Sequence, residues 1–258
     1  KVEAHPFNFD DPKKLTESLR GADVLYNTYW VRFPWKGMTY EKAAENSETL
    51  VRAAVDAGVK RIVHVSIVRP TADSPYGYYR GKTKVEEAIH TSGLSYAILR
   101  PTVLFGGEDI LINNIAWSLR RFPVFMMCGK GEYKMQPIHV EDLARLAVEG
   151  GAREDSYTID AIGPETFTFK EFVQTVASYT VSGTLILRVP RPIFLLMSKL
   201  IGLLKNDVML TADELDGLMD GLMASDEEPT GTIKLTDWVN KNSELLGRVY
   251  QSELARRR

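Results

Sequence analysis

The sequence Arg61-Ile62-Val63-His64-Val65-Ser66 is an almost continuous run of apolar residues. Such a run is typical of a strand that is covered on both faces, as in a parallel sheet. A helix is predicted from Tyr78 to about His90, Gly93 ends it, and residues 94–101 are predicted to form another strand. A strand, a helix and a second strand in this order predict a right-handed crossover in a doubly wound parallel sheet.

The segments on either side continue this alternation of strands and helices. Further strands are predicted at residues 2–9, 23–27, 156–161 and 184–189. Further helices are predicted at residues 12–19, 40–57, 110–121, 139–149 and 168–179, with mostly helical structure toward the C-terminus. Residues 129–136 are predicted to form a hairpin or a loop. The fold class is therefore α/β.

The composition is that of a soluble globular protein. The chain has 258 residues, of which 44% are hydrophobic and 26% charged. The formal net charge of −2 argues against a nucleic-acid-binding face, which would need to be basic. The single cysteine, Cys128, excludes a disulfide within the chain, so a cytoplasmic location is expected.

The most apolar stretch is residues 192–204, PIFLLMSKLIGLL, which contains Lys199. It is too short to span a bilayer. We interpret it as a helix in the core or at an interface, and the alternative is a helix that lies on a membrane surface.

Proton-transfer chemistry is indicated by Tyr78-Tyr79-Arg80-Gly81-Lys82. On a helix, residues four apart lie on one face, so Tyr78 and Lys82 can point into one cleft. An ammonium beside a phenol favours the phenolate, and this makes the phenol a better proton donor and acceptor near neutral pH. The pair is the proton-transfer half of a site that interconverts carbonyls and alcohols.

Six sequence landmarks occur in the order and rough spacing of a known family. They are Ala22-Asp23-Val24-Leu25-Tyr26, Asn46 with Leu50, Ala53 and Ala54, Ile62-Val63-His64-Val65-Ser66, Tyr78-x-x-x-Lys82 with Glu86, Leu99-Arg100-Pro101-Thr102-Val103-Leu104-Phe105-Gly106, and Ile138-His139-Val140-Glu141-Asp142-Leu143-Ala144. The chain resembles the extended and atypical short-chain dehydrogenase/reductases, in their epimerase/dehydratase-like and NmrA-like branches. The resemblance implies a Rossmann-like sheet, an NAD or NADP cofactor and a small-molecule substrate.

The resemblance also implies a division into domains. Residues 1–105, with parts of 106–165, would form the NAD(P)-binding domain, and residues 106–258 would form most of a smaller, mainly helical substrate domain. The family opens with a glycine-rich turn that holds the pyrophosphate, and this sequence contains no such turn. Residues 2–9 align with the family's third strand, so the first two strands and the glycine-rich turn would lie upstream of Lys1. The alternative is a self-sufficient variant that is built without this unit.

The catalytic residues implied by the resemblance are Tyr78, Lys82 and Ser66. Tyr78 would be the general acid/base, and Lys82 would bind the nicotinamide ribose and lower the pKa of the phenol. The family has a serine-rich run where this chain has Val65-Ser66-Ile67-Val68, with only one hydroxyl. Ser66 matches the earlier position of that run and Ile67 or Val68 the catalytic one. Thr71 or Ser74 could supply the hydroxyl instead.

The cofactor-binding residues expected from the resemblance and from the sheet edge form a longer set. Asn8 would contact the adenine, and Pro101, Thr102 and Val103 would lie beside the nicotinamide carboxamide. Asn46 either holds backbone near the cofactor or is a polar residue on a helix surface. Thr28 and Tyr29 follow a predicted strand, at the carboxyl edge where ligands of open sheets bind.

Other polar and aromatic residues have plainer interpretations. His139 and Asp142 lie three apart with no further ligands nearby in the sequence, so we interpret them as structural and predict no metal site. Trp30, Phe33 and Trp35 either line an apolar substrate site or pack beneath a long loop.

The predicted function is NAD(P)-dependent hydride transfer, as in an oxidoreductase, an epimerase or a dehydratase. The first alternative is a non-catalytic NAD(P)-binding protein, either a regulator of the NmrA-like type or an accessory subunit of a respiratory complex. The second alternative is a membrane-peripheral reductase, suggested by residues 193–204 and the Trp30/Trp35 loop.

Overall fold

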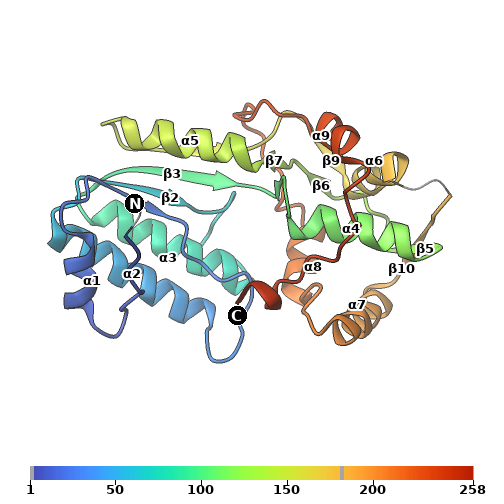
Figure 1. Ribbon diagram of the computed structural model, residues 1–258, viewed down its shortest axis with the longest axis horizontal. Coiled ribbons are helices and arrows are strands. Elements are labelled where there is room, and N and C mark those ends of the chain that lie inside the picture. Colours follow the sequence, from blue (N-terminus) through green and yellow to red (C-terminus); the bar gives the residue numbers. More distant parts are fainter. Residues whose placement is uncertain (1–2, 181–182, 258) are drawn as a thin grey trace. The chain divides into compact units, whose positions relative to one another are not determined.

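A parallel sheet of four strands organises the first of two units in the computed structural model, which describes residues 3–180 and 183–257 (Figure 1). This unit comprises the chain up to Pro101 together with Leu143–Ala161. Its strands lie in the order β1-β2-β3-β8 and are β1 (Val24–Asn27), β2 (Arg61–Val65), β3 (Ser95–Pro101) and β8 (Tyr157–Ala161). The predicted parallel α/β sheet is therefore confirmed.

Helices cover both faces of this sheet (Figure 1). They are α1 (Pro12–Leu19), α2 (Tyr40–Ala57), α3 (Gly77–Thr91) and α5 (Val140–Ala152). Ile62 and Ile98 pack against α2 and α3 on one face. On the other face, α5 comes so close that a Cβ atom at Gly150 would lie 3.1 Å from the Cβ of Ala97. Burial on both sides is the reason that three of the five residues of β2 are Ile62, Val63 and Val65.

Local signals set the ends of α1 and α2. The Asp11 side chain accepts a hydrogen bond from the Lys14 N–H at 3.3 Å, and Thr39 accepts one from the Lys42 N–H at 3.1 Å. Gly58 ends α2 with a φ of +81°, a conformation that glycine adopts without strain.

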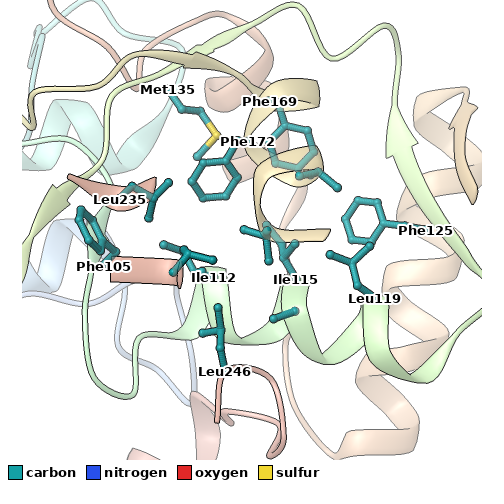
Figure 2. Close-up of a cluster of buried hydrophobic side chains, with 14 of the residues drawn as sticks. Phe105, Ile112, Ile115, Leu119, Phe125, Met135, Phe169, Phe172, Leu235 and Leu246 are labelled. Carbon is teal, nitrogen blue, oxygen red and sulfur yellow. The ribbon is translucent and has the colours of Figure 1, made fainter. Parts of the chain in front are cut away.

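The second unit comprises Thr102–Asp142 and the chain from Ile162 onward. Its helices are α4 (Ile110–Arg121), α6 (Phe169–Thr180), α7 (Arg191–Lys205), α8 (Ala212–Met219), α9 (Leu235–Asn242) and a short 3₁₀ helix, η1 (Leu254–Arg257). Its strands form three pairs, β5 (Val124–Cys128) with β10 (Leu185–Val189), β4 (Leu104–Phe105) with β7 (Ile138–His139), and β6 (Lys134–Met135) with β9 (Phe167–Thr168). The core between α4 and α6 contains Phe105, Ile112, Phe172 and Leu235 (Figure 2).

One expected strand is absent and one strand was missed. Glu3–Asn8 form no strand, and Val2 lies outside the described residues. The reason is that β1 is the edge of the described sheet, so this segment has no strand to pair with and Phe7 and Phe9 pack on Tyr29 instead. The pattern also missed β5, which pairs with β10 far along the chain, and β6 pairs with β9 rather than within a hairpin.

Candidate functional site

The Lys82 side chain lies beneath the indole of Trp30. Lys82 is 2% exposed, its Nζ donates a hydrogen bond to the Val65 carbonyl at 2.7 Å, and the same Nζ is 4.7 Å from the centre of the Trp30 ring. Gly81 makes this packing feasible, because a Cβ atom there would lie 2.8 Å from the indole. Lys82 is therefore held by a backbone oxygen and an aromatic face within the protein.

Tyr78 contacts the same indole. Its ring meets the ring of Trp30 edge-on at 5.8 Å between centroids and that of Tyr40 at 5.7 Å. Trp30 and Tyr40 stack nearly parallel at 6.5 Å. Tyr78 and Lys82 thus lie on the same side of α3, one turn apart, and the Trp30 indole packs on both.

Burial changes the proton affinity of two bases at this site. Burial lowers the pKa of Lys82 from its ordinary value of 10.5 to about 7, and the nearby carboxylate of Glu86 raises it by a smaller amount. Burial, and then the charge of Lys82, hold the pKa of His64 well below its usual value. His64 is therefore neutral near pH 7, and Lys82 titrates there.

The shifted pKa of Lys82 makes the stability of the protein depend on pH. Between pH 7 and 10.5 the unfolded chain binds more protons than the folded one, so the free energy of unfolding rises with pH across this window. We expect Lys82→Met to remove a rise on the order of a few kcal/mol, measured by urea unfolding between pH 7 and 10. Lys84→Met, on the exposed side of α3, should keep the wild-type slope. Parallel curves for wild type and Lys82→Met would contradict the assignment.

A chain of hydrogen bonds orders the turn that follows β1. The Asn27 side-chain amide lies 3.1 Å from Nδ1 of His64, and its oxygen accepts the Tyr29 N–H at 3.1 Å. The Asn46 amide donates to the Tyr29 hydroxyl at 2.8 Å. Asn46 is buried on α2 and is therefore not a residue of the helix surface, and its amide fixes the Tyr29 ring.

Three buried polar atoms near the carboxyl ends of β1 and β2 have no hydrogen-bond partner among the described residues. They are Nε2 of His64, Oγ of Ser66 and Nε1 of Trp30. Since His64 accepts the Asn27 amide at Nδ1, its proton lies on Nε2. Unpaired buried donors cost free energy, and they are the kind of atoms that a bound ligand or water satisfies.

A hollow of about 230 Å³ adjoins this end of β1, within the first unit. Phe7, Asn27, Thr28 and Tyr29 contribute to its lining. The rings of Phe7 and Tyr29 approach to 5.5 Å, and Phe7 is 64% exposed. Asn8 lies next to Phe7 but is absent from the lining of this hollow, and its carbonyl accepts the Asp11 N–H at 3.0 Å.

The hydroxyl groups expected near Tyr78 have other surroundings. Ser66 is buried, and its N–H donates to the Leu99 carbonyl at 2.7 Å. Ile67 and Val68 are buried too, so this run presents no exposed hydroxyl. Ser74 accepts the Tyr76 N–H at 3.2 Å, and Thr71 accepts the Asp73 N–H at 3.4 Å. These two hydroxyls hydrogen-bond to the backbone of their own loop.

The remaining predicted residues divide between the two units. Pro101 ends β3 in the first unit, whereas Thr102 and Val103 belong to the second. There the Thr102 hydroxyl donates to the Gln136 carbonyl, and the Val103 carbonyl accepts the Ile138 N–H at 2.9 Å.

His139 and Asp142 have structural partners in the second unit. The His139 ring meets Phe105 edge-on at 5.0 Å, and Asp142 accepts the N–H groups of Thr232 and Ile233 at 2.9 and 2.8 Å. Among residues 3–180 and 183–257, no three His, Cys, Asp or Glu side chains gather as a metal site would require. No helix within the described parts of the chain is both long and apolar enough to cross a membrane.

Sequence reasoning missed the residues that surround Lys82. In the loop that contains Trp30, Phe33 and Trp35, Phe33 is buried, Trp35 is 39% exposed, and Trp30 packs on Lys82 of α3. The available signal was Gly81 inside a helix, because a glycine there indicates that another group comes close.

Comparisons with known proteins agree with this architecture. An NAD(P)H-binding family model matches residues 1–116. The mitochondrial 40 kDa subunit of NADH-ubiquinone oxidoreductase from Neurospora crassa is 29% identical over 180 residues, which are 68% of this chain and 47% of that protein. The chain spans about half the length of the curated relatives it matches first.

Two solved structures share the fold. The triphenylmethane reductase of Citrobacter sp., complexed with NADP(H), has a TM-score of 0.71 and 18% identity, covering 92% of this chain and 81% of that one. The NADPH-dependent quinone oxidoreductase of Escherichia coli has a TM-score of 0.72 and 21% identity, covering 91% and 81%. The family model thus matches residues 1–116, and the chain has the Rossmann-like α/β fold of these two reductases.

Proposed function

We propose that this protein holds NAD(P) by its adenine half and does not turn the cofactor over. The observation that carries the proposal is the position of Trp30, whose indole packs on both Lys82 and Tyr78. In the family that the sequence resembles, a nicotinamide ribose would contact this lysine. Here the lysine is 2% exposed, and its ammonium already donates to the Val65 carbonyl.

The hollow beside β1 fits the adenine half. Its volume of about 230 Å³ is below the roughly 300–1,000 Å³ typical of sites for whole drug-sized ligands, so it suits a nucleobase rather than a dinucleotide. Phe7 and Tyr29 offer aromatic faces in its lining, and Thr28 adds a polar side chain. At the end where a nicotinamide would bind, Trp30 covers Lys82 and Tyr78, so these residues do not fit a nicotinamide while the indole stays in place. The proposal therefore includes no hydride transfer.

The relatives support a role without turnover. The Neurospora crassa protein is named as a subunit of a larger oxidoreductase. This name favours a nucleotide-binding subunit of an assembly over an independent enzyme. The apolar, buried Ile67 and Val68 also leave the end of β2 without an exposed hydroxyl that could polarise a substrate carbonyl.

Competition binding tests the proposal. We expect the protein to bind NADPH or NADH saturably, AMP to compete, and nicotinamide mononucleotide not to compete at the same concentration. Trp30→Ala should let nicotinamide mononucleotide compete, because it removes the ring that covers Lys82. Trp35→Ala, at an exposed tryptophan of the same loop, is the matched control and should behave as wild type. Competition by nicotinamide mononucleotide in the wild type would contradict the closed nicotinamide end.

The second candidate function is NAD(P)-dependent oxidoreduction, which one observation favours. Tyr78 and Lys82 lie on the same side of α3, so an indole that swung away would uncover both together. When bound, the cofactor would supply the hydride, and Tyr78 would hold or move the proton of the substrate oxygen. Turnover in the wild type that Tyr78→Phe abolishes, with cofactor affinity unchanged, would establish this function in place of the first.

A further inference from the structure

Helix α7 exposes its apolar face to solvent. Ile193, Leu196, Leu200, Leu203 and Leu204 are between 44% and 85% exposed. Their spacing places them along one stripe of the helix, about 100° wide. A stripe of this kind normally faces a core, and when it is exposed it marks an interaction surface.

The opposite side of α7 explains why the leucines point outward. Ser198 and Gly202 are the buried residues of this helix, which lies beside β5 in the second unit (Figure 1). A Cβ atom at Gly202 would lie 2.7 Å from the Asp207 carbonyl. Small residues thus form the inner contact, and the bulky residues form the outer surface.

The preceding strand extends the apolar surface. Leu185 and Leu187 of β10 are exposed by 57% and 41%, and their spacing of two places them on the same face of the strand. Only Pro190 separates β10 from α7. The α7 surface, defined by these two leucines and the five residues of the helix stripe, is therefore formed by consecutive elements of one unit.

The charged residues around α7 indicate which kind of partner would bind the α7 surface. Residues 172–206 contain four cationic residues and no carboxylate, although the whole chain has a net charge of −2. The cationic residues are Arg188, Arg191, Lys199 and Lys205. Arg191 pairs with Asp216, while Lys199 is exposed on α7 and borders the apolar stripe. A second copy of the chain would bring like charges face to face, whereas an anionic lipid surface would attract them.

We propose that the α7 surface binds the surface of an anionic membrane, with α7 lying in the plane of the headgroups. The leucine stripe would enter the boundary between headgroups and acyl chains, and Lys199 would contact lipid phosphates. This interaction is separate from nucleotide binding, which the first unit carries.

Vesicle flotation tests this proposal on the whole protein. We expect flotation with phosphatidylcholine vesicles that contain phosphatidylglycerol, weaker flotation with phosphatidylcholine alone, and loss of binding as salt is raised. The variant Leu200→Glu/Leu203→Glu/Leu204→Glu should bind anionic vesicles at least tenfold more weakly. Leu245→Glu is the matched control, because Leu245 is 77% exposed and lies outside α7, and it should bind as wild type does.

A charge-reversal variant keeps the test independent of the leucines. Lys199→Glu should reduce binding to anionic vesicles and leave binding to neutral ones unchanged. The proposal is overturned if the protein stays unbound with anionic vesicles, or if the leucine variant floats as well as wild type. It is also overturned if sedimentation without lipid shows a dimer that the leucine variant dissociates. Nucleotide affinity, measured on the same variants, should be unchanged and so separates this result from the proposed function.

Discussion

Replacing Arg100 by methionine is expected to lower the free energy of unfolding by about 3 kcal/mol. Arg100 binds Glu86 through two hydrogen bonds, from Nε at 3.1 Å and from Nη2 at 2.6 Å. The Glu86 side chain is 4% exposed and that of Arg100 is 29% exposed. Removal of the arginine leaves the Glu86 carboxylate on α3 buried without its main partner. The free energy of unfolding therefore falls by more than the ion pair itself contributed.

The control is an ion pair at the surface. Arg20 and Glu17 interact at 2.9 Å with both side chains more than half exposed, so Arg20→Met should cost at most about 1 kcal/mol. Urea unfolding of both variants gives the comparison. The double variant Arg100→Met/Glu86→Gln should recover part of the loss, since the buried charge is gone. Equal losses for Arg100→Met and Arg20→Met would show that the pair contributes no more than a surface contact.

Replacing Gly247 by alanine is expected to destabilise the protein by about 3 kcal/mol or more. Gly247 has a φ of +72°, which strains any residue with a Cβ atom. That Cβ would also lie 2.4 Å from the carbonyl carbon of Ala116 and 2.4 Å from the nitrogen of Trp117, both in the backbone of α4. Because α4 packs into the core of the second unit (Figure 2), the helix cannot easily move away.

A second glycine serves as the control that separates backbone strain from a steric clash. Gly58 has a φ of +81° but nothing within 4 Å of its Cβ position, so Gly58→Ala should cost only about 1 kcal/mol. Thermal unfolding and near-ultraviolet circular dichroism of both variants would measure the difference. If Gly247→Ala lowered the free energy of unfolding no more than Gly58→Ala does, the predicted steric clash with the backbone of α4 would be contradicted.

The helices and strands that were predicted well from the sequence are those whose bounds depend on residues within or next to them. Tyr40–Ala57 and Ile110–Arg121 were predicted to the residue, because apolar spacing, an N-terminal cap and a following breaker are properties of neighbouring residues. The four strands of the first sheet were found because each contains a short run of β-branched and other apolar residues between helical segments. Strand β5 was missed, and it pairs with residues of β10 that lie about sixty positions away.

The candidate site was likewise predicted only in part from the sequence. The spacing of Tyr78 and Lys82 was enough to place both on one side of α3, since helical geometry relates residues four apart. Nothing local to α3 says that Trp30, about fifty positions earlier, covers Lys82, or that Val65 accepts its hydrogen bond. Local periodicity thus specified the α/β architecture and the helix bearing the tyrosine and lysine. Burial and solvent access at that lysine depend on packing between distant segments, which emerges only when the chain is folded.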